Sequence, residues 1–272
     1  MPGTSHLSSR VFHIRKENDN IPYMEYMTSE LVREWIDRAG INASTAARRA
    51  GVSASTLHRI LTDQVDPSIG TLREIAIGCG VDLSLTSGKL SDWRAAATAR
   101  SMFEEGYVVA KNDIADWEPR LTRLAEGDNP VEIVSAAARA SAPLHRDGAT
   151  WCTGTMTVGT VASAGDASGG RWALSGAAGL YLSDTGEPTP AITILWCDDP
   201  RSVSQLLAAS AVRTTDRIDR TTLAVVRGEP ELFAGSFTKG LTRYAAPIQI
   251  IIDCLSLGGD VAKDAREEAM TW

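Results

Sequence analysis

The chain has 272 residues, of which 43% are hydrophobic, and its formal net charge is −7. This length suggests about two domains with sizeable cores, and the negative charge argues against a protein coated in nucleic acid, although a local basic face is compatible with it. The sequence has no apolar run long enough for a membrane span, no signal peptide and no CxxC pair among its four cysteines. We therefore expect a cytoplasmic protein with reduced thiols and no membrane partner.

The first 27 residues mix polar and charged types with little periodicity, which predicts a flexible N-terminal arm over residues 1–27. Met24 and Met27 stand immediately before the first convincing helix, so the true translation start is left open. That helix is predicted to begin at Thr28 or Ser29 and to end before Gly40.

Residues 46–61 have the pattern of a helix-turn-helix. Gly51 can supply the positive φ of a tight turn, and Ser53 can cap the helix that follows. Leu57 and Ile60 recur at helical spacing and should face the core, which leaves small, polar and basic side chains outward. Such a helix can enter a major groove with its first turn near base edges. From the turn alone, an ordinary pair of packed helices is the alternative.

The next helix is predicted from Ser68, with Leu72, Ile75 and Ala76 at helical spacing, and a short fifth element is predicted over residues 82–85. This order resembles the Cro/CI-type (XRE) helix-turn-helix family over about residues 28 to 87. The residues that carry the match are Ala47, Gly51, Val52, Ser53, Thr56, Leu57, Ile60, Pro67, Leu72, Ala76 and Val81. The resemblance implies an all-α, five-helix DNA-binding domain, which we assign to residues 28–90.

The resemblance also implies which side chains meet DNA. Those nearest the bases are Ser53, Ala54, Ser55, Thr56, His58 and Arg59, and those that contact phosphates are Arg33, Arg48 and Arg49. Where the family often has a glutamine near the start of the second helix, this chain has Ala43. Arg59 is the one strong guanine reader in the outward set. One domain offers few contacts, so a homodimer on a palindromic double-stranded DNA operator is expected.

Beyond residue 90 the chain changes character, and we expect an α+β protein overall. Residues 91–145 are predicted to be a helical connector, and residues 146–272 a mixed α/β domain with a small sheet. The predicted helices cover residues 93–109, 112–125, 130–140, 171–182, 201–212, 243–260 and 260–270. The predicted strands cover residues 191–196 and 221–226, with a third at Leu232 and Phe233, and residues 165–170 are predicted to form a loop.

Two C-terminal segments, WALSGAAG and YAAPIQIIIDCLSLGG, resemble the C-terminal antitoxin domain of the AbiEi family of type IV toxin–antitoxin systems. The resemblance covers about residues 150 to 270. It implies a regulator that represses its own operon and counteracts a toxin resembling a nucleotidyltransferase. Asp260 stands where the family tends to have an arginine, and the usual winged N-terminal domain is replaced by the Cro/CI-type unit. The candidate functional residues are Arg171, Trp172, Tyr244, Gln249 and Asp253, for which a place in the core is the alternative.

No catalytic site is expected. Lys111, Lys239 and Lys263 are the only lysines in the predicted connector and C-terminal domain, and no motif supports a serine–lysine pair there. The chain has four histidines, from which neither a metal cluster nor a Ser-His-Asp triad can be assembled. We expect no enzyme, cofactor or metal, but a sequence-specific transcriptional repressor, the autoregulating antitoxin of a toxin–antitoxin or phage-defence operon. The alternatives are a repressor that senses a small ligand in a cleft near Trp172, Trp196 and Tyr244, and a protein-interaction scaffold without DNA binding.

Overall fold

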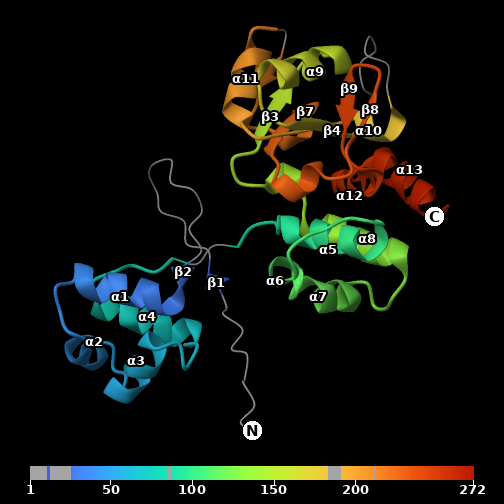
Figure 1. Ribbon diagram of the computed structural model, residues 1–272. Helices are drawn as coiled ribbons and strands as arrows, with labels where there is room; N and C mark the ends of the chain where they lie inside the picture. The colour runs from blue at the N-terminus through green and yellow to red at the C-terminus, as the bar shows by residue number, and fades with distance from the viewer. Residues whose placement is uncertain (1–10, 13–25, 85–86, 183–190, 211) are drawn as a thin grey trace. The chain divides into compact units, whose positions relative to one another are not determined.

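The computed structural model describes residues 11–12, 26–84, 87–182, 191–210 and 212–272 (Figure 1). Across these ranges, no helix is both long enough and apolar enough to cross a membrane.

The chain divides into two compact units, Met1–Ser87 and Gly88–Trp272. The described part of the first unit is mainly helical, with α1 (Thr28–Arg38), α2 (Ala43–Arg49), α3 (Ala54–Leu61) and α4 (Ile69–Gly78). These helices enclose one core, because each contributes buried apolar side chains from one face. The side-chain oxygens of Asn42, Ser53 and Ser68 accept backbone N–H groups at the starts of α2, α3 and α4. The helix starts therefore follow from local sequence.

The structure changes two expectations at the ends of this unit. In the predicted flexible arm, β1 (Val11–Phe12) pairs antiparallel with β2 (Tyr26–Met27), and residues 1–10 and 13–25 lie outside the described residues. Residues 81–84 are not helical, so the prediction of a fifth helix is wrong for residues 82–84. Residue 85 lies outside the described residues. Gly80 takes a φ of +76° and ends α4. The few residues that follow it could form too few hydrogen bonds to offset the free-energy cost of nucleating another helix.

The second unit begins with a group of helices. They are α5 (Trp93–Phe103), α6 (Lys111–Ile114), α7 (Trp117–Leu124) and α8 (Pro130–Ala140). Buried alanines of α5 and α8 belong to the same apolar cluster as Leu174 and Val225 of the sheet. The segment expected to be a connector, residues 91–145, therefore shares its core with residues 146–272.

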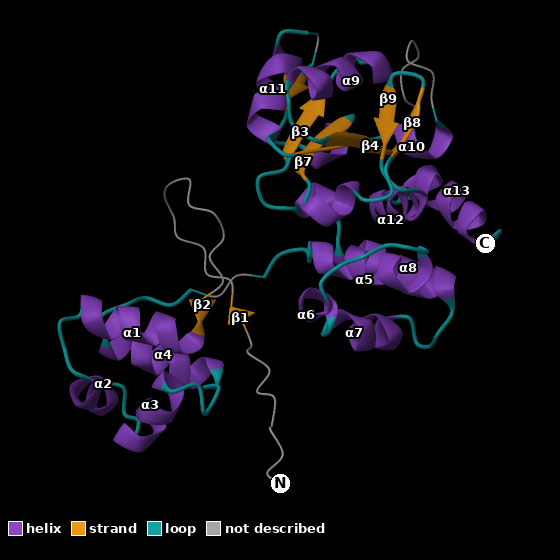
Figure 2. Ribbon diagram, viewed as in Figure 1, coloured by secondary structure: helices purple, strands orange, loops and turns teal. Residues whose placement is uncertain are grey.

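A mixed sheet of seven strands lies at the centre of the second unit, as far as the residues are described (Figure 2). Its strands are β3 (Thr150–Thr153), β4 (Trp172–Gly176), β5 (Thr193–Cys197), β6 (Arg213–Thr214), β7 (Leu223–Arg227), β8 (Phe237–Lys239) and β9 (Thr242–Tyr244). Their order across the sheet is β6-β3-β7-β5-β4-β9-β8. The pairs β5–β7 and β4–β9 are parallel, and the other neighbours are antiparallel. Strands β4 and β5 are buried along their whole length, which explains why most of their side chains are apolar.

Helices cover both faces of this sheet (Figure 1). On one face, α9 (Val158–Ala167) and α11 (Pro200–Ala208) pack against the strands and each other. On the other face, α12 (Pro247–Leu257) contacts β4, α8, α10 (Ala177–Tyr181) and α13 (Gly259–Ala269). Short 3₁₀ helices are η1 (Pro143–His145), η2 (Ile218–Arg220) and η3 (Pro230–Phe233). Since side chains alternate along a strand, Trp172 of β4 faces α9 and Ser175 faces α12.

Several predicted elements of the second unit are wrong. Residues 172–176 form strand β4 instead of helix, and the helix α10 begins only at Ala177. Tyr244, predicted within a helix, belongs to strand β9. A short apolar run that is buried on all sides shows neither a helical nor a strand period, so its type depends on what packs around it.

Two further assignments were also overturned. Leu232 and Phe233 lie in the 3₁₀ helix η3, which follows Pro230, and they are not a strand. Residues 165–167, predicted to be in a loop, form the last turn of α9. A Cβ atom on Gly165 would lie only 2.6 Å from Cδ2 of Trp172, so glycine here permits close helix–strand packing.

Candidate nucleic-acid interface

The turn between α2 and α3 is built by the residues that the sequence singled out. Gly51 has a φ of +66°, and the N–H of Val52 donates to the carbonyl of Ala47 at 3.0 Å. The Ser53 hydroxyl then accepts the N–H of Thr56 at 2.9 Å, which caps α3. Leu57 and Ile60 are each 1% exposed in the core of the first unit. The helix-turn-helix is therefore held by a local turn at one end and by burial of one face of α3.

The opposite face of α3 is open to solvent. Ala54, Ser55, His58 and Arg59 are exposed, as is the capping residue Ser53. Thr56 differs from these, because it is half-buried and its hydroxyl lies 2.8 Å from that of Ser53. The first turn of α3 thus presents small side chains that would let the backbone approach a groove closely.

The three arginines expected at phosphates have different surroundings. Arg48 and Arg49 are exposed in the last turn of α2, and no described residue forms a hydrogen bond or ion pair with their side chains. Arg33 is also exposed, but its guanidinium donates to the carbonyl of Leu61 at the end of α3. Two of the three guanidinium groups are therefore available to a phosphate without breaking a contact.

The C-terminal candidates do not form a single cluster. Trp172 and Tyr244 are buried on the α9 face of the sheet, where the Trp172 Nε1–H donates to Asp166 Oδ1 at 2.8 Å. Trp196 is buried on the opposite face, so the cleft expected near Trp172, Trp196 and Tyr244 is not formed. Neighbouring residues of β4 and β5 point to opposite faces, which separates the tryptophans.

Arg171 is a surface residue at the start of β4. Its guanidinium Nη2 lies 2.9 Å from Oδ1 of Asp198, and its backbone N–H donates to Oδ2 of the same carboxylate at 2.8 Å. The hydrogen bond from the Arg171 side chain lowers the pKa of Asp198. This ion pair joins the adjacent ends of β4 and β5, and an exposed pair of this kind contributes little to stability.

Gln249 and Asp253 do come together, on one face of α12. The Asp253 carboxylate accepts hydrogen bonds from Ser175 Oγ at 2.6 Å, Trp196 Nε1 at 2.7 Å and Gln249 Nε2 at 2.9 Å. Burial raises the pKa of Asp253 to about 6, although all three hydrogen bonds lower it. Sequence reasoning did not include Ser175 among the candidates, and it placed Trp196 in a ligand cleft and not beside Asp253, because no local pattern shows which strand residues will face α12.

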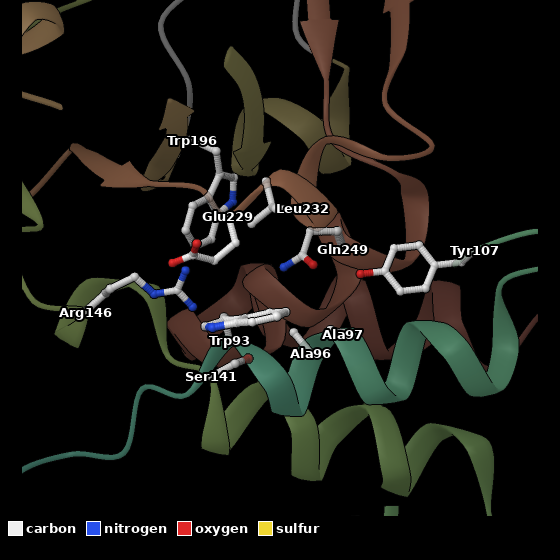
Figure 3. A pocket seen from close by; sticks show the side chains of 10 residues that line it. All are labelled: Trp93, Ala96, Ala97, Tyr107, Ser141, Arg146, Trp196, Glu229, Leu232 and Gln249. Carbon is white, nitrogen blue, oxygen red and sulfur yellow. The ribbon is translucent and has the colours of Figure 1, made fainter. Parts of the chain in front are cut away.

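Gln249 and Trp196 also line a small pocket in the second unit, together with Trp93, Arg146 and Glu229 (Figure 3). The Arg146 guanidinium lies 4.9 Å from the centroid of the Trp196 ring and donates to the carbonyl of Arg227 at 3.3 Å. The volume of this pocket is about 10 Å³. Such a volume holds about one water molecule, which is too little for an organic effector.

Part of the first unit matches a known protein family. Residues 29–87 match the family model described as "Helix-turn-helix domain". Neither a curated protein nor a solved structure matches the chain. The match ends at residue 87, where the first compact unit also ends, and it contains α1 to α4. The first unit therefore contains a helix-turn-helix domain of the XRE/Cro type, a domain that suggests sequence-specific DNA binding and transcription regulation.

Proposed function

We propose that the protein is a transcriptional repressor that binds a palindromic operator as a homodimer. The observation that carries this proposal is the exposed face of α3, whose capped first turn presents Ser53, Ala54 and Ser55. Small side chains there permit close approach to base edges, and Arg59 on the same exposed face can donate two hydrogen bonds to a guanine. Arg48 and Arg49 add positive charge next to this helix, in a chain that is acidic overall.

A dimer is proposed because α3 has only eight residues. One recognition helix of this length reads few base pairs, whereas two copies related by a two-fold axis read two half-sites about 34 Å apart. Sedimentation equilibrium, with and without the operator duplex, tests this part. A stoichiometry of one chain for each operator would contradict it.

The first experiment compares binding of the purified protein to the DNA upstream of its own gene with binding to a random duplex of equal length. Each titration is done at two salt concentrations, because phosphate contacts weaken steeply with salt and base contacts do not. We expect preferred binding to the upstream DNA that persists at the higher salt. Equal, salt-sensitive binding to both duplexes would argue against autoregulation. If the protein binds neither duplex, the result would favour a protein-interaction scaffold.

We further propose that residues 150–270 act as the antitoxin of a toxin–antitoxin or phage-defence operon, with a nucleotidyltransferase-like toxin as partner. Support comes from the place of the two segments that resemble the AbiEi family. They are far apart in sequence, yet β4 pairs with β9, α12 packs against β4 and α10, and Ser175 donates to Asp253. They therefore form one continuous part of the fold.

The antitoxin proposal is tested by co-expression with an adjacent nucleotidyltransferase-like gene. We expect the toxin alone to arrest growth and the full-length protein to restore it. A variant with Arg48 and Arg49 changed to alanine separates the two roles, because it should lose repression and keep neutralisation if the C-terminal part acts independently. Failure of the wild-type protein to restore growth would contradict the antitoxin role.

No catalytic reaction is part of this proposal, and a ligand-sensing role is not favoured. The tryptophans and tyrosine expected to line an effector cleft lie on different faces of the sheet, and the pocket beside Trp196 holds about one water molecule.

A further inference from the structure

The C-terminal end of the recognition helix α3 is held by two side chains of α1. The Ser29 hydroxyl donates to Oδ2 of Asp63 at 2.9 Å, and the Arg33 guanidinium donates to the carbonyl of Leu61. Ser29 and Arg33 are four residues apart, so they lie on the same face of α1. Together with Asp63 they form what we call the α1 clamp. The clamp contacts the two ends of a short segment, Leu61 to Asp63, where the chain leaves α3.

Asp63 has an unusual backbone conformation for which the clamp offers an explanation. Its φ is +54°, in the left-handed region that aspartate and asparagine tolerate better than most side chains. Its N–H donates to the carbonyl of Ile60, and the next N–H, of Gln64, donates to the carbonyl of Arg59 at 2.8 Å. The left-handed turn thus closes the end of α3 and directs the Asp63 carboxylate toward Ser29.

Charge also favours this arrangement. The Asp63 carboxylate lies at the N-terminal turn of α1, and the Arg33 guanidinium lies at the C-terminal end of α3. Each helix end therefore receives the sign of charge that its dipole favours. Ser29 is fully buried, so its hydroxyl would lose its partner if Asp63 were removed.

At the other end of α3, the side chains of Ala54 and Ser55 are exposed on the face that is expected to meet DNA. An α-helix rises 1.5 Å for each residue, so the far end of α3 lies about 10 Å from the clamp, and a rotation of about 10° would move it by about 2 Å. A hydrogen bond to a base edge does not survive such a displacement. Contacts at the C-terminal end of α3 can therefore control what its N-terminal end reads.

We propose that Ser29 and Asp63 are positioning residues that set the angle of α3 in the major groove and thereby its sequence discrimination, with Arg33 supporting the same helix end. This inference rests on the proposed function, because it concerns how the repressor distinguishes its operator. Neither Ser29 nor Asp63 is assigned a contact with DNA. Their effect should consequently appear in the ratio of specific to non-specific affinity.

The test uses full-length variants and two duplexes, one selected by the wild-type protein from a random library and one of random sequence. Asp63→Gly removes the carboxylate but keeps a residue suited to positive φ, and Ser29→Ala removes the donor. We expect each to weaken binding to the selected duplex by about three- to tenfold relative to its control, as for one lost hydrogen bond. Binding to the random duplex should follow the control, and the double variant should be no worse than either single one.

Two further variants make the result specific. Asp66→Gly is the matched control, because it removes the same charge from the same exposed loop at a residue with no hydrogen-bond partner in the described structure. Asp63→Asn keeps an acceptor for Ser29 and should restore discrimination. Thermal unfolding of each variant shows that it is folded at the temperature of binding. If Asp63→Gly and Ser29→Ala discriminate as well as Asp66→Gly, the clamp has no positioning role; if the wild type shows no preference, the proposed function itself fails.

Discussion

Arg48 and Arg59 are both exposed arginines of the helix-turn-helix domain, but they lie on different helices and should contribute differently to binding. Arg59 is on α3 and Arg48 is in the last turn of α2. In the proposed complex, α3 enters the groove and the end of α2 lies beside the DNA backbone. Base contacts carry sequence information and phosphate contacts do not. The two side chains therefore provide a comparison between specific and non-specific binding.

We predict that Arg59→Ala weakens binding to the operator by about ten- to hundredfold and relaxes sequence preference, as expected for a lost bidentate guanine contact. Arg48→Ala should weaken binding to all DNA and reduce the slope of log affinity against log salt by about 1. Titrations of both variants against operator and random duplex over a series of salt concentrations measure these effects. Equal losses on both duplexes for both variants would remove Arg59 as a base reader.

A second residue-scale prediction concerns Asp253, whose pKa is raised by burial to about 6. An exposed aspartate titrates near pH 4, so between about pH 4 and pH 6 the folded protein holds a proton that the unfolded chain has lost. Stability from this group should therefore be greatest below about pH 4, fall as pH rises, and level off above about pH 6. The total change is about 2–3 kcal/mol.

The variant Asp253→Asn removes this titration, and a rotated Gln249 amide can accept from the new amide group. The free energy of unfolding of the wild type minus that of the variant should therefore decrease between pH 4 and pH 6, as measured by urea unfolding. Other titrating groups cancel in this difference. A difference that is constant or increases over this range would show that Asp253 does not titrate as proposed.

At the scale of single elements, the contact between α9 and β4 depends on close packing that no local sequence pattern indicates. Gly165 is in the last turn of α9, and Trp172 of β4 is buried beneath it. The short distance between them leaves no room for a methyl group. Neither the helix that contains Gly165 nor the strand that contains Trp172 was predicted, since both elements contain glycine, which is unfavourable inside helices and strands alike.

We predict that Gly165→Ala lowers the free energy of unfolding by about 1–3 kcal/mol, because the Trp172 ring must move in a packed core. Gly70→Ala is the comparison, since Gly70 is within α4 and its added Cβ would meet only Ser68 Oγ at 3.8 Å. That substitution should stabilise by about 0.5–1 kcal/mol through the usual preference of helices for alanine. Denaturant unfolding of both variants measures the two changes in the free energy of unfolding. If both substitutions stabilise the protein, α9 and β4 are not in close contact.

At the scale of the whole molecule, the two compact units have separate cores. The buried cluster of the first unit contains residues 31–79 only, and the largest cluster of the second contains residues 95–269 only. Residues unfold cooperatively when they share a core. A chain with two separate cores is therefore not expected to unfold in a single two-state transition.

Leu57→Ala tests this. Leu57 is 1% exposed, and its truncation should destabilise the first unit by about 2–5 kcal/mol. We expect scanning calorimetry to show one transition moved to lower temperature and the other unchanged, with DNA binding lost at the temperature where the first unit unfolds. A common shift of all unfolding heat would instead show that the two units unfold together.

The parts of the fold that could be predicted depend on short-range signals. The positions of α1 to α4 follow from caps such as Ser53 and from apolar residues at helical spacing, and α8, α12 and α13 could be located because proline or glycine marks their ends. The strands β3, β6, β8 and β9 were missed, since a segment of two to four residues is too short to show the alternation of apolar and polar side chains that identifies a strand.

The sequence by itself determined the helix-turn-helix domain, because its turn, its cap and its buried stripe all arise from residues within one or two helical turns of each other. Only the tertiary structure decided the contacts between distant residues. Ser175 and Trp196 are 78 and 57 residues from their partner Asp253, and Ser29 is 34 residues from Asp63. Such pairs depend on which strands become neighbours and on their register, and a register is chosen by the packing of a whole sheet.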